Sequence, residues 1–112
     1  MPRMKRDIPV EPVDMASLEA LTFQERLAIG IERLKAERDV KNRVLAEQLG
    51  VDEAYISRLA RAMGDVKLST LDKMRRAWNV DGENLLKVTE ADLPLIAVWK
   101  TRLKKKKAAE TP

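Results

Sequence analysis

The feature that most constrains this chain is a glycine between two short stretches of helical periodicity. Residues 42–61 read NRVLAEQLGVDEAYISRLAR. Gly50 stands where the chain must reverse direction, and glycine accepts a positive φ without steric cost. The apolar inner positions are Leu45, Ala46 and Leu49 before the glycine and Val51, Ile56 and Leu59 after it. The pattern predicts two short helices that pack against each other at a tight corner.

The outward side of the second predicted helix carries short or polar side chains. Its positions are Asp52, Glu53, Ala54, Ser57, Arg58 and Arg61. Side chains of this kind on an exposed helix can reach the edges of base pairs in the major groove of DNA. The corner therefore has the pattern of a DNA-reading helix-turn-helix.

Five of these side chains are predicted to contact bases. A guanidinium can donate two parallel hydrogen bonds to guanine, which makes Arg58 the first choice for a base reader. In the alternative interpretation, Arg58 and Arg61 only pair with acidic residues on the protein surface. The predicted base-reading set is Glu53, Ala54, Ser57, Arg58 and Arg61.

The start of the first predicted helix is the expected contact with DNA phosphates. Lys41, Asn42 and Arg43 lie there, and the free N–H groups and positive dipole end of a helix N-terminus favour an anion. Tyr55 either donates a hydrogen bond to a phosphate or covers the edge of the core. Both interpretations stay open at this point.

Composition excludes several classes of chemistry. The chain of 112 residues contains no cysteine and no histidine, so disulfides, thiolate metal sites and histidine acid–base catalysis lack their usual residues. We expect no metal, no cofactor and no enzymatic activity. No apolar run approaches a membrane span, and no signal peptide is evident, so we expect a cytoplasmic protein without a membrane partner. The net charge is +4, and residues 91–112 hold six basic and two acidic residues, so the excess lies in the tail.

Capping residues and apolar periodicity predict five helices in the main part of the chain. They cover residues 23–38, residues 43–49, residues 53–62, a segment that begins between residues 66 and 70, and a short segment after Asp81. The expected N-caps are Thr22, Asn42, Asp52, either Asp65 or Ser69, and Asp81. Two apolar stripes are assigned to the core, namely Phe23, Leu27, Ile31 and Leu34, and Leu68, Leu71, Met74 and Trp78.

Two flanking segments complete the predicted organisation, with residues 22–90 as the domain between them. Residues 1–21 are expected to form an extended arm with a short helical turn over 14–21. Residues 91–112 are expected to form a helix that starts at Asp92 and Pro94 and ends in a frayed tail from Lys104. Trp99 either packs back on the domain or lies across a two-fold axis, and we favour the dimer. The predicted dimerisation residues are Ile96, Trp99 and Leu103.

Two segments, LAEQLGVDEAYISRL and LSTLDKMRRAWNVDGENLL, resemble the phage-repressor and Cro-like (lambda-repressor-like) helix-turn-helix family. The resemblance covers about residues 22–88. It implies a compact all-α domain of five helices whose third helix enters the major groove, and a dimer on a pseudo-palindromic operator. Ala62 replaces a glycine common in the family and Gly64 follows, so we expect the third helix to run longer than usual.

Together these features favour a sequence-specific transcriptional regulator. We expect a homodimeric repressor that binds double-stranded DNA and blocks polymerase by occlusion. One alternative is an antitoxin whose segments 1–21 and 91–112 grip a toxin partner. Another alternative is a protein-interaction or coactivator module on the same scaffold, since fold alone does not settle function.

Overall fold

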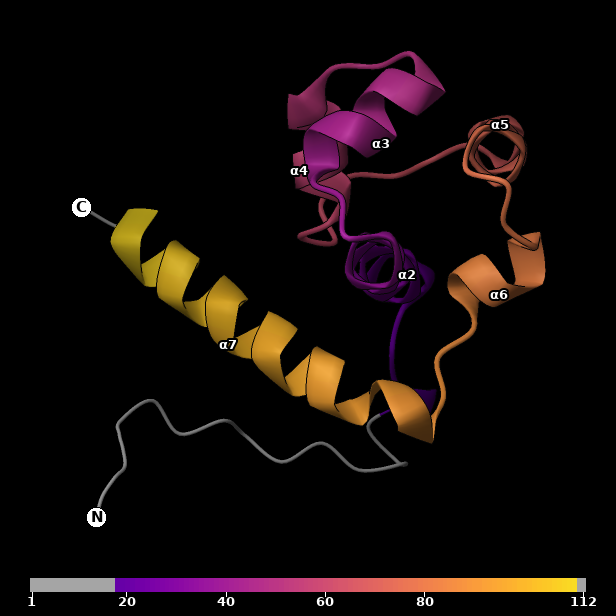
Figure 1. Ribbon diagram of the computed structural model, residues 1–112. Helices are drawn as coiled ribbons and strands as arrows, with labels where there is room; N and C mark the ends of the chain where they lie inside the picture. Colours follow the sequence, from indigo (N-terminus) through magenta and orange to yellow (C-terminus); the bar gives the residue numbers. More distant parts are fainter. Residues whose placement is uncertain (1–17, 111–112) are drawn as a thin grey trace.

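Every regular element that the structure describes is helical. The computed structural model describes residues 18–110, with side chains as far as residue 103. The elements are α2 (Phe23–Arg38), α3 (Asn42–Leu49), α4 (Glu53–Leu59), α5 (Leu68–Ala77), α6 (Gly82–Leu86), the 3-10 turn η1 (Glu90–Asp92) and α7 (Leu93–Glu110). The predicted all-α class is confirmed, with α2–α6 as the five predicted helices and α7 as the predicted C-terminal helix. Figure 1 shows α2 end-on at the centre, with the other helices around it.

The central helix α2 has the predicted bounds because its first turn is capped as expected. The backbone N–H of Glu25 donates to Thr22 Oγ1 over 3.1 Å, and the Glu25 carboxylate accepts from the Thr22 N–H over 2.9 Å. These two bonds satisfy two donors that a helix start otherwise leaves free. The helix ends at Asp39, whose φ of 52° is left-handed.

Other predicted boundaries need correction. The N-cap of α3 is Lys41 rather than Asn42, and that of α5 is Lys67 rather than Asp65 or Ser69. Neither lysine makes a side-chain capping bond, so composition gave no local signal. α7 continues to Glu110, where a frayed tail was expected. Within the predicted turn over 14–21, residues 18 and 19 are helical, while residues 1–17 lie outside the described part.

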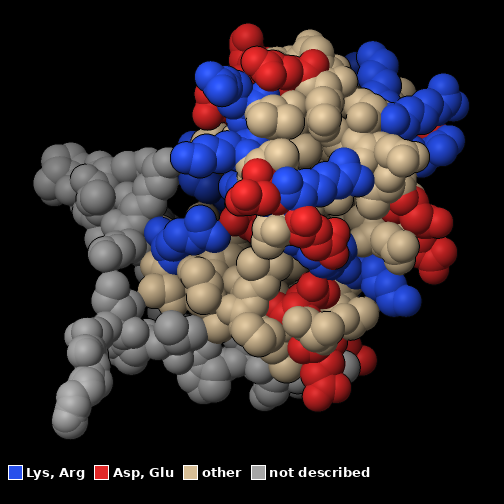
Figure 2. All heavy atoms as spheres, viewed as in Figure 1, with Lys and Arg blue, Asp and Glu red and all other residues tan. Residues whose placement is uncertain are grey.

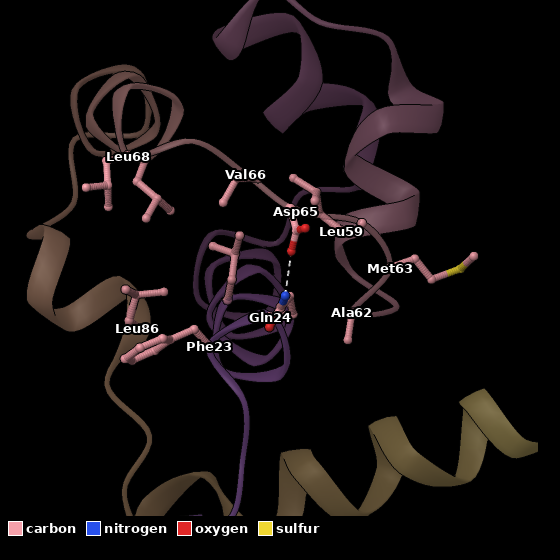
Figure 3. Close-up of a pocket in the computed structure, with 12 residues that line it drawn as sticks. Phe23, Gln24, Leu59, Ala62, Met63, Asp65, Val66, Leu68 and Leu86 are labelled. Atoms are coloured by element: carbon pink, nitrogen blue, oxygen red, sulfur yellow. Dashed lines mark hydrogen bonds between the residues drawn. The ribbon is translucent and has the colours of Figure 1, made fainter.

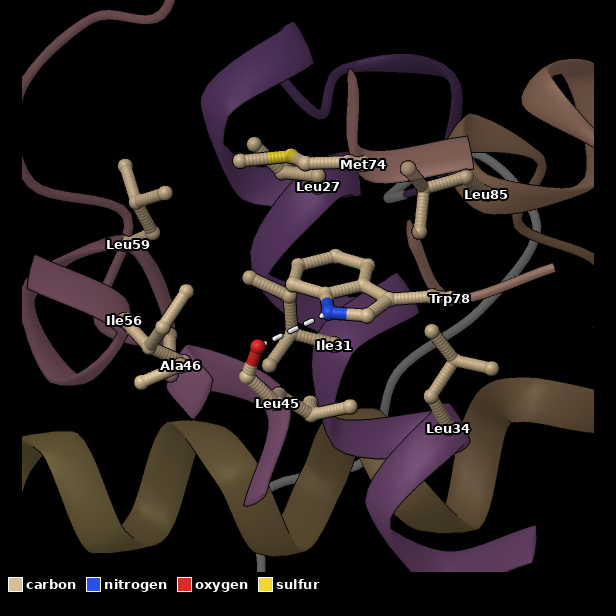
Figure 4. Close-up of a cluster of buried hydrophobic side chains, with 11 residues drawn as sticks. Leu27, Ile31, Leu34, Leu45, Ala46, Ile56, Leu59, Met74, Trp78 and Leu85 are labelled. Atoms are coloured by element: carbon tan, nitrogen blue, oxygen red, sulfur yellow. Dashed lines mark hydrogen bonds between the residues drawn. The ribbon is translucent and has the colours of Figure 1, made fainter. Parts of the chain in front are cut away.

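The main hydrophobic core gathers around the indole of Trp78, which is fully buried (Figure 4). Its Nε1 donates to the carbonyl oxygen of Leu45 in α3 over 3.0 Å. Leu45, Ile56 and Met74 around it are also fully buried. The core therefore ties the helical corner to α5, and the assignment of Trp78 to the core is confirmed.

A second cluster holds α7 against the rest of the chain. Ile96 is fully buried and Trp99 is 3% exposed, and both pack with Ala28 and Ile29 of α2. The indole Nε1 of Trp99 donates to the carbonyl oxygen of Ala60 over 2.6 Å. In this conformation the side chains of Ile96 and Trp99 are buried within the chain. Dimerisation through Ile96, Trp99 and Leu103 stays a prediction.

Ion pairs fasten the same region. The buried carboxylate of Glu32 contacts Lys35 over 2.8 Å and Arg102 of α7 over 2.7 Å. Arg33 binds the Asp92 carboxylate over 3.1 Å, and that carboxylate also accepts from the Thr89 N–H over 2.9 Å. Asp92 therefore closes the first turn of η1 instead of capping α7, because α7 begins at Leu93.

Gly30 marks the closest approach of two helices, and we predict that Gly30→Ala destabilises the fold. An added Cβ at this buried position would overlap the backbone carbonyl of Leu85 in α6. In an exposed helix interior the change is favourable by about 1 kcal/mol. Here overpacking against backbone reverses the sign, and a loss of about 1–3 kcal/mol is expected in urea unfolding followed by circular dichroism.

Ala36→Gly is the matched control for that measurement. Ala36 is exposed on the same helix, so its replacement reports helix propensity alone, with an expected loss of about 0.5–1 kcal/mol. An unchanged or raised stability of Gly30→Ala would contradict the close packing of α2 on α6.

Candidate nucleic-acid interface

The corner between α3 and α4 is closed by Gly50 in the predicted way. Its φ of 80° is left-handed, and its N–H donates to the Glu47 carbonyl over 3.3 Å and to that of Ala46 over 2.8 Å. The Val51 N–H also donates to Ala46 over 3.0 Å. These bonds form a Schellman motif, which satisfies carbonyls at the end of α3 and sends the chain directly into α4.

The helix α4 is shorter than expected. It ends at Leu59, and Ala62 adopts a left-handed φ of 60°. The N–H of Met63 donates to the Arg58 carbonyl over 3.0 Å, and the N–H of Ala62 donates to the Leu59 carbonyl over 3.0 Å. The turn therefore closes like the one at Gly50, although alanine occupies the left-handed position. The expectation of a longer helix is wrong.

The two sides of α4 differ as the corner predicted. Ile56 and Leu59 face the core, at 0% and 4% exposure. Val51, which was expected on the inner face, is instead 36% exposed. On the outer side Glu53, Ala54 and Arg58 are exposed. No other described part of the chain buries these three side chains.

The remaining two base-reading candidates are only partly exposed. Ser57 and Arg61 lie beside the exposed face, and Arg61 Nε donates to the Ser57 carbonyl over 3.4 Å. That contact turns part of the Arg61 guanidinium toward its own helix. Arg58 is therefore the better placed of the two arginines.

The guanidinium of Arg58 lies over the ring of Tyr55, 6.0 Å from its centroid. Tyr55 is half-buried and packs against the main core. At this distance the attraction between cation and ring is weak, but the ring still limits where the long arginine side chain can go. Helical spacing of three residues could have predicted this contact.

Arg58 forms no ion pair with any residue between 18 and 103, the range in which side chains are described. By contrast, Arg75 and Arg76 on α5 bind the Asp72 carboxylate over 2.8 and 3.1 Å. Surface pairing of Arg58, the alternative interpretation, is therefore not seen among these residues.

The start of α3 carries the predicted phosphate contacts. Lys41 and Arg43 are exposed, and Asn42 between them is half-buried. The Asn42 side-chain oxygen is buried without a hydrogen-bond donor among the described residues. Because Lys41 and Arg43 are exposed, their side chains can reach an anion beside the helix N-terminus.

Charge does not gather into one patch on the face shown in Figure 2, where basic and acidic side chains alternate. On this face, binding of a polyanion would depend on particular positions and not on a general positive field. Between residues 18 and 103, no group of Asp and Glu side chains could hold a metal ion. No described helix is long and apolar enough to cross a membrane.

A solved structure is similar to this chain over most of the length of both. The crystal structure of the hypothetical transcription factor NHTF from Neisseria superposes with a TM-score of 0.59 at 26% sequence identity. The match covers 80% of this chain and 97% of that chain. No protein-family model and no curated protein sequence matches this chain. The two proteins therefore share a fold that extends beyond the helical corner.

Proposed function

We propose that this chain is a DNA-binding transcription regulator that inserts α4 into the major groove. The observation that carries this proposal is the exposed guanidinium of Arg58, on the outward face of the corner and without an ion pair among the described residues. The similarity to a hypothetical transcription factor supports the same conclusion at the level of the fold.

Base contacts and phosphate contacts divide between the two helices of the corner. In this proposal Arg58 reads guanine, Glu53 and Ala54 contact neighbouring bases, and Ser57 and Arg61 assist from the edge of the face. Lys41, Asn42 and Arg43 hold the DNA backbone and fix the angle at which α4 enters the groove. Tyr55 acts through its packing under Arg58 and at the edge of the core.

The finer proposal is a homodimeric repressor of the phage-repressor type. Two copies on a pseudo-palindromic operator exclude polymerase by occupying the site, without chemistry and without a cofactor. A cytoplasmic location follows from this role. No contact within the described residues favours the antitoxin or coactivator alternative over this one.

Selection of bound duplexes from random DNA tests the proposal. We expect enrichment of two half-sites whose centres lie about one helical turn, or a multiple of it, apart. Lys41 and Arg43 from two copies neutralise about four phosphates, so affinity is expected to fall about 150-fold between 50 and 200 mM salt.

Two outcomes of that selection would count against the regulator. If no sequence is enriched while the salt dependence is steep, the chain binds DNA without reading it. If no duplex is retarded at physiological salt, the coactivator alternative becomes the better account.

A further inference from the structure

The C-terminal part of α7 is the most basic segment of the chain. Residues 100–110 read KTRLKKKKAAE and hold six of the 22 basic residues but only one of the 18 acidic ones. Their net charge is therefore +5, and that of the rest of the chain is −1, from a total of +4. We call residues 100–107 the basic end of α7. A helix end with this charge, on a domain that is nearly neutral, attracts polyanions.

The charge of the basic end is not compensated within the helix. Lys100 and Lys104 are four positions apart, as are Arg102 and Lys106, and like charges at this spacing destabilise a helix. The one acidic residue of the segment, Glu110, is the last residue of α7. Cations gain from the helix dipole within the last turn, but most of the basic end precedes that turn. Bound phosphates would relieve the repulsion along the whole segment.

Contacts in the middle of α7 hold this helix against the end of α4. The indole of Trp99 is buried, and its Nε1 donates over 2.6 Å to the carbonyl oxygen of Ala60, the residue that follows α4. Ala62 packs against the same cluster, and the close-up of the neighbouring cavity shows Ala62 above α7 (Figure 3). Arg102 binds the buried carboxylate of Glu32 in α2 over 2.7 Å. The core therefore fixes the position of α7 relative to α4.

The run of lysines lies beyond these contacts. Because an α-helix rises 1.5 Å per residue, Lys104 and Lys107 are about 8 and 12 Å further along the axis than Trp99. Figure 1 shows the last turns of α7 extending past α2 on the side of α4, away from α5 and α6. The major groove is about 12 Å wide. A helix end at this distance from α4 therefore matches the phosphate strand that borders the groove.

We propose that the basic end of α7 binds DNA phosphates on the flank of the site that α4 contacts. The binding is independent of sequence, because phosphates carry no sequence information. This inference rests on the proposed function, since it requires α4 to lie in the major groove. The basic end adds affinity and fixes the orientation of α4, while Arg58 selects the bases.

A membrane surface is the other polyanion to which runs of lysine bind. A helix that lies on a membrane needs a broad apolar face beside its cations. The apolar residues Ile96 and Trp99 of α7 are buried against α2. Among the described side chains of α7, Val98 is the only large apolar one that is exposed. DNA is therefore the better match.

Replacement of all four lysines of residues 104–107 by glutamine, called here the α7 variant, tests the contact. We expect about two of the four to meet one phosphate strand in each copy, in addition to the contacts of Lys41 and Arg43. On a duplex with one half-site, the slope of log affinity against log salt concentration should therefore become less steep by about 1.8. Affinity at low salt should fall about tenfold or more, for operator and unrelated duplexes alike. Fluorescence anisotropy titrations at several salt concentrations measure both quantities.

Two control variants separate position from charge and from folding. Replacement of the same four lysines by arginine keeps the charge and should keep the wild-type slope. Glutamine is a good helix former, so circular dichroism of the α7 variant should be unchanged. The second control removes four charges from exposed positions of α5 and α6, with glutamine at Lys73, Arg75, Arg76 and Lys87. The proposal is overturned if the α7 variant keeps the wild-type slope, or if the second control loses as much.

Directed cleavage places the end of α7 on the duplex. The chain contains no cysteine, so Ala108→Cys provides a single thiol for an iron chelate. This variant should cut the DNA backbone at one cluster of positions on the flank of the half-site. Glu83→Cys, at an exposed position of α6, carries the same reagent and should give no cuts above background. Uniform cutting by Ala108→Cys, or cuts from Glu83→Cys alone, would contradict the proposed position.

The outcomes separate this inference from the proposed function. If selection enriches no sequence and the α7 variant still has a less steep slope on unrelated DNA, the sequence-specific regulator fails while the contact stands. If a sequence is enriched and the α7 variant binds it with the wild-type slope, the contact fails while the regulator stands. Vesicles of phosphatidylserine and phosphatidylcholine provide the membrane arm. Vesicle binding that depends on the four lysines, with DNA affinity unchanged, would assign the basic end to a membrane and overturn the proposal.

Discussion

Arg58→Ala should reduce affinity for the selected operator by about 5- to 150-fold per half-site. The lost interaction is a pair of hydrogen bonds between one guanidinium and one guanine, which discriminates by about 1–3 kcal/mol. Affinity for unrelated DNA should change far less, because phosphate contacts from α3 remain. Competition between operator and unrelated duplex in a mobility-shift titration measures both quantities.

Arg76→Ala is the matched control for charge. Arg76 is an exposed arginine on α5 that is paired with Asp72, so the substitution removes the same formal charge away from the outward face of α4. Its effect on the ratio of operator to unrelated affinity is expected to be negligible. If Arg58→Ala keeps the wild-type ratio, or if Arg76→Ala loses it, the assignment of α4 as the reading helix is wrong.

Trp78→Ala should remove about 3–5 kcal/mol from the free energy of unfolding. The indole is fully buried between α2, α3 and α5, and its loss leaves a cavity that rigid helices cannot close. Small domains of this size have little more stability than that to lose. Urea unfolding by circular dichroism at a fixed protein concentration measures the change.

Two further variants separate packing from hydrogen bonding at this site. Trp78→Phe keeps an aromatic ring but removes the donor to the Leu45 carbonyl, and a smaller loss of about 1–3 kcal/mol is expected. Val98→Ala, at a half-exposed position on α7, should stay within about 0.5 kcal/mol of wild type. A loss below 1 kcal/mol for Trp78→Ala would mean that the indole is not the centre of the core.

Local signals predicted the parts of the fold that local forces determine. The capping box at Thr22 set the start of α2, and Gly50 set the corner, because each depends on residues within one or two turns. The end of α4 was not predictable in this way. Its left-handed turn occurs at Ala62, where composition favoured continuation of the helix.

The larger differences between the predicted and the observed structure come from tertiary packing. Periodicity says which side of a helix is apolar, but it does not say whether another element covers that side. Phe23 and Leu68 carried the same signal as Leu27 and Met74, yet only the latter are covered. Trp99 carried no local signal for its partner, because the Ala60 carbonyl is 39 residues away in the chain.

The geometry of the helical corner predicted the residues of the candidate site better than the charge of the sequence did. The exposed side of α4 was predicted residue by residue for Glu53, Ala54 and Arg58. Ser57 and Arg61 lie beside this exposed side and are only partly exposed, so their contact with bases stays a prediction. The exposure of Phe23 and Leu68 was missed because each begins a helix, and the whole apolar stripe of that helix was assumed to be covered.

The two tryptophans of the chain lie where their fluorescence reports on the helical corner. Trp78 is bonded to a carbonyl of α3, and Trp99 is bonded to the carbonyl that follows α4. Each emitter therefore senses one half of the same corner, and with only two in the sequence their signals can be told apart by substituting one at a time. Ultraviolet fluorescence of the unlabelled protein thus reports on the two helices separately, without any attached dye.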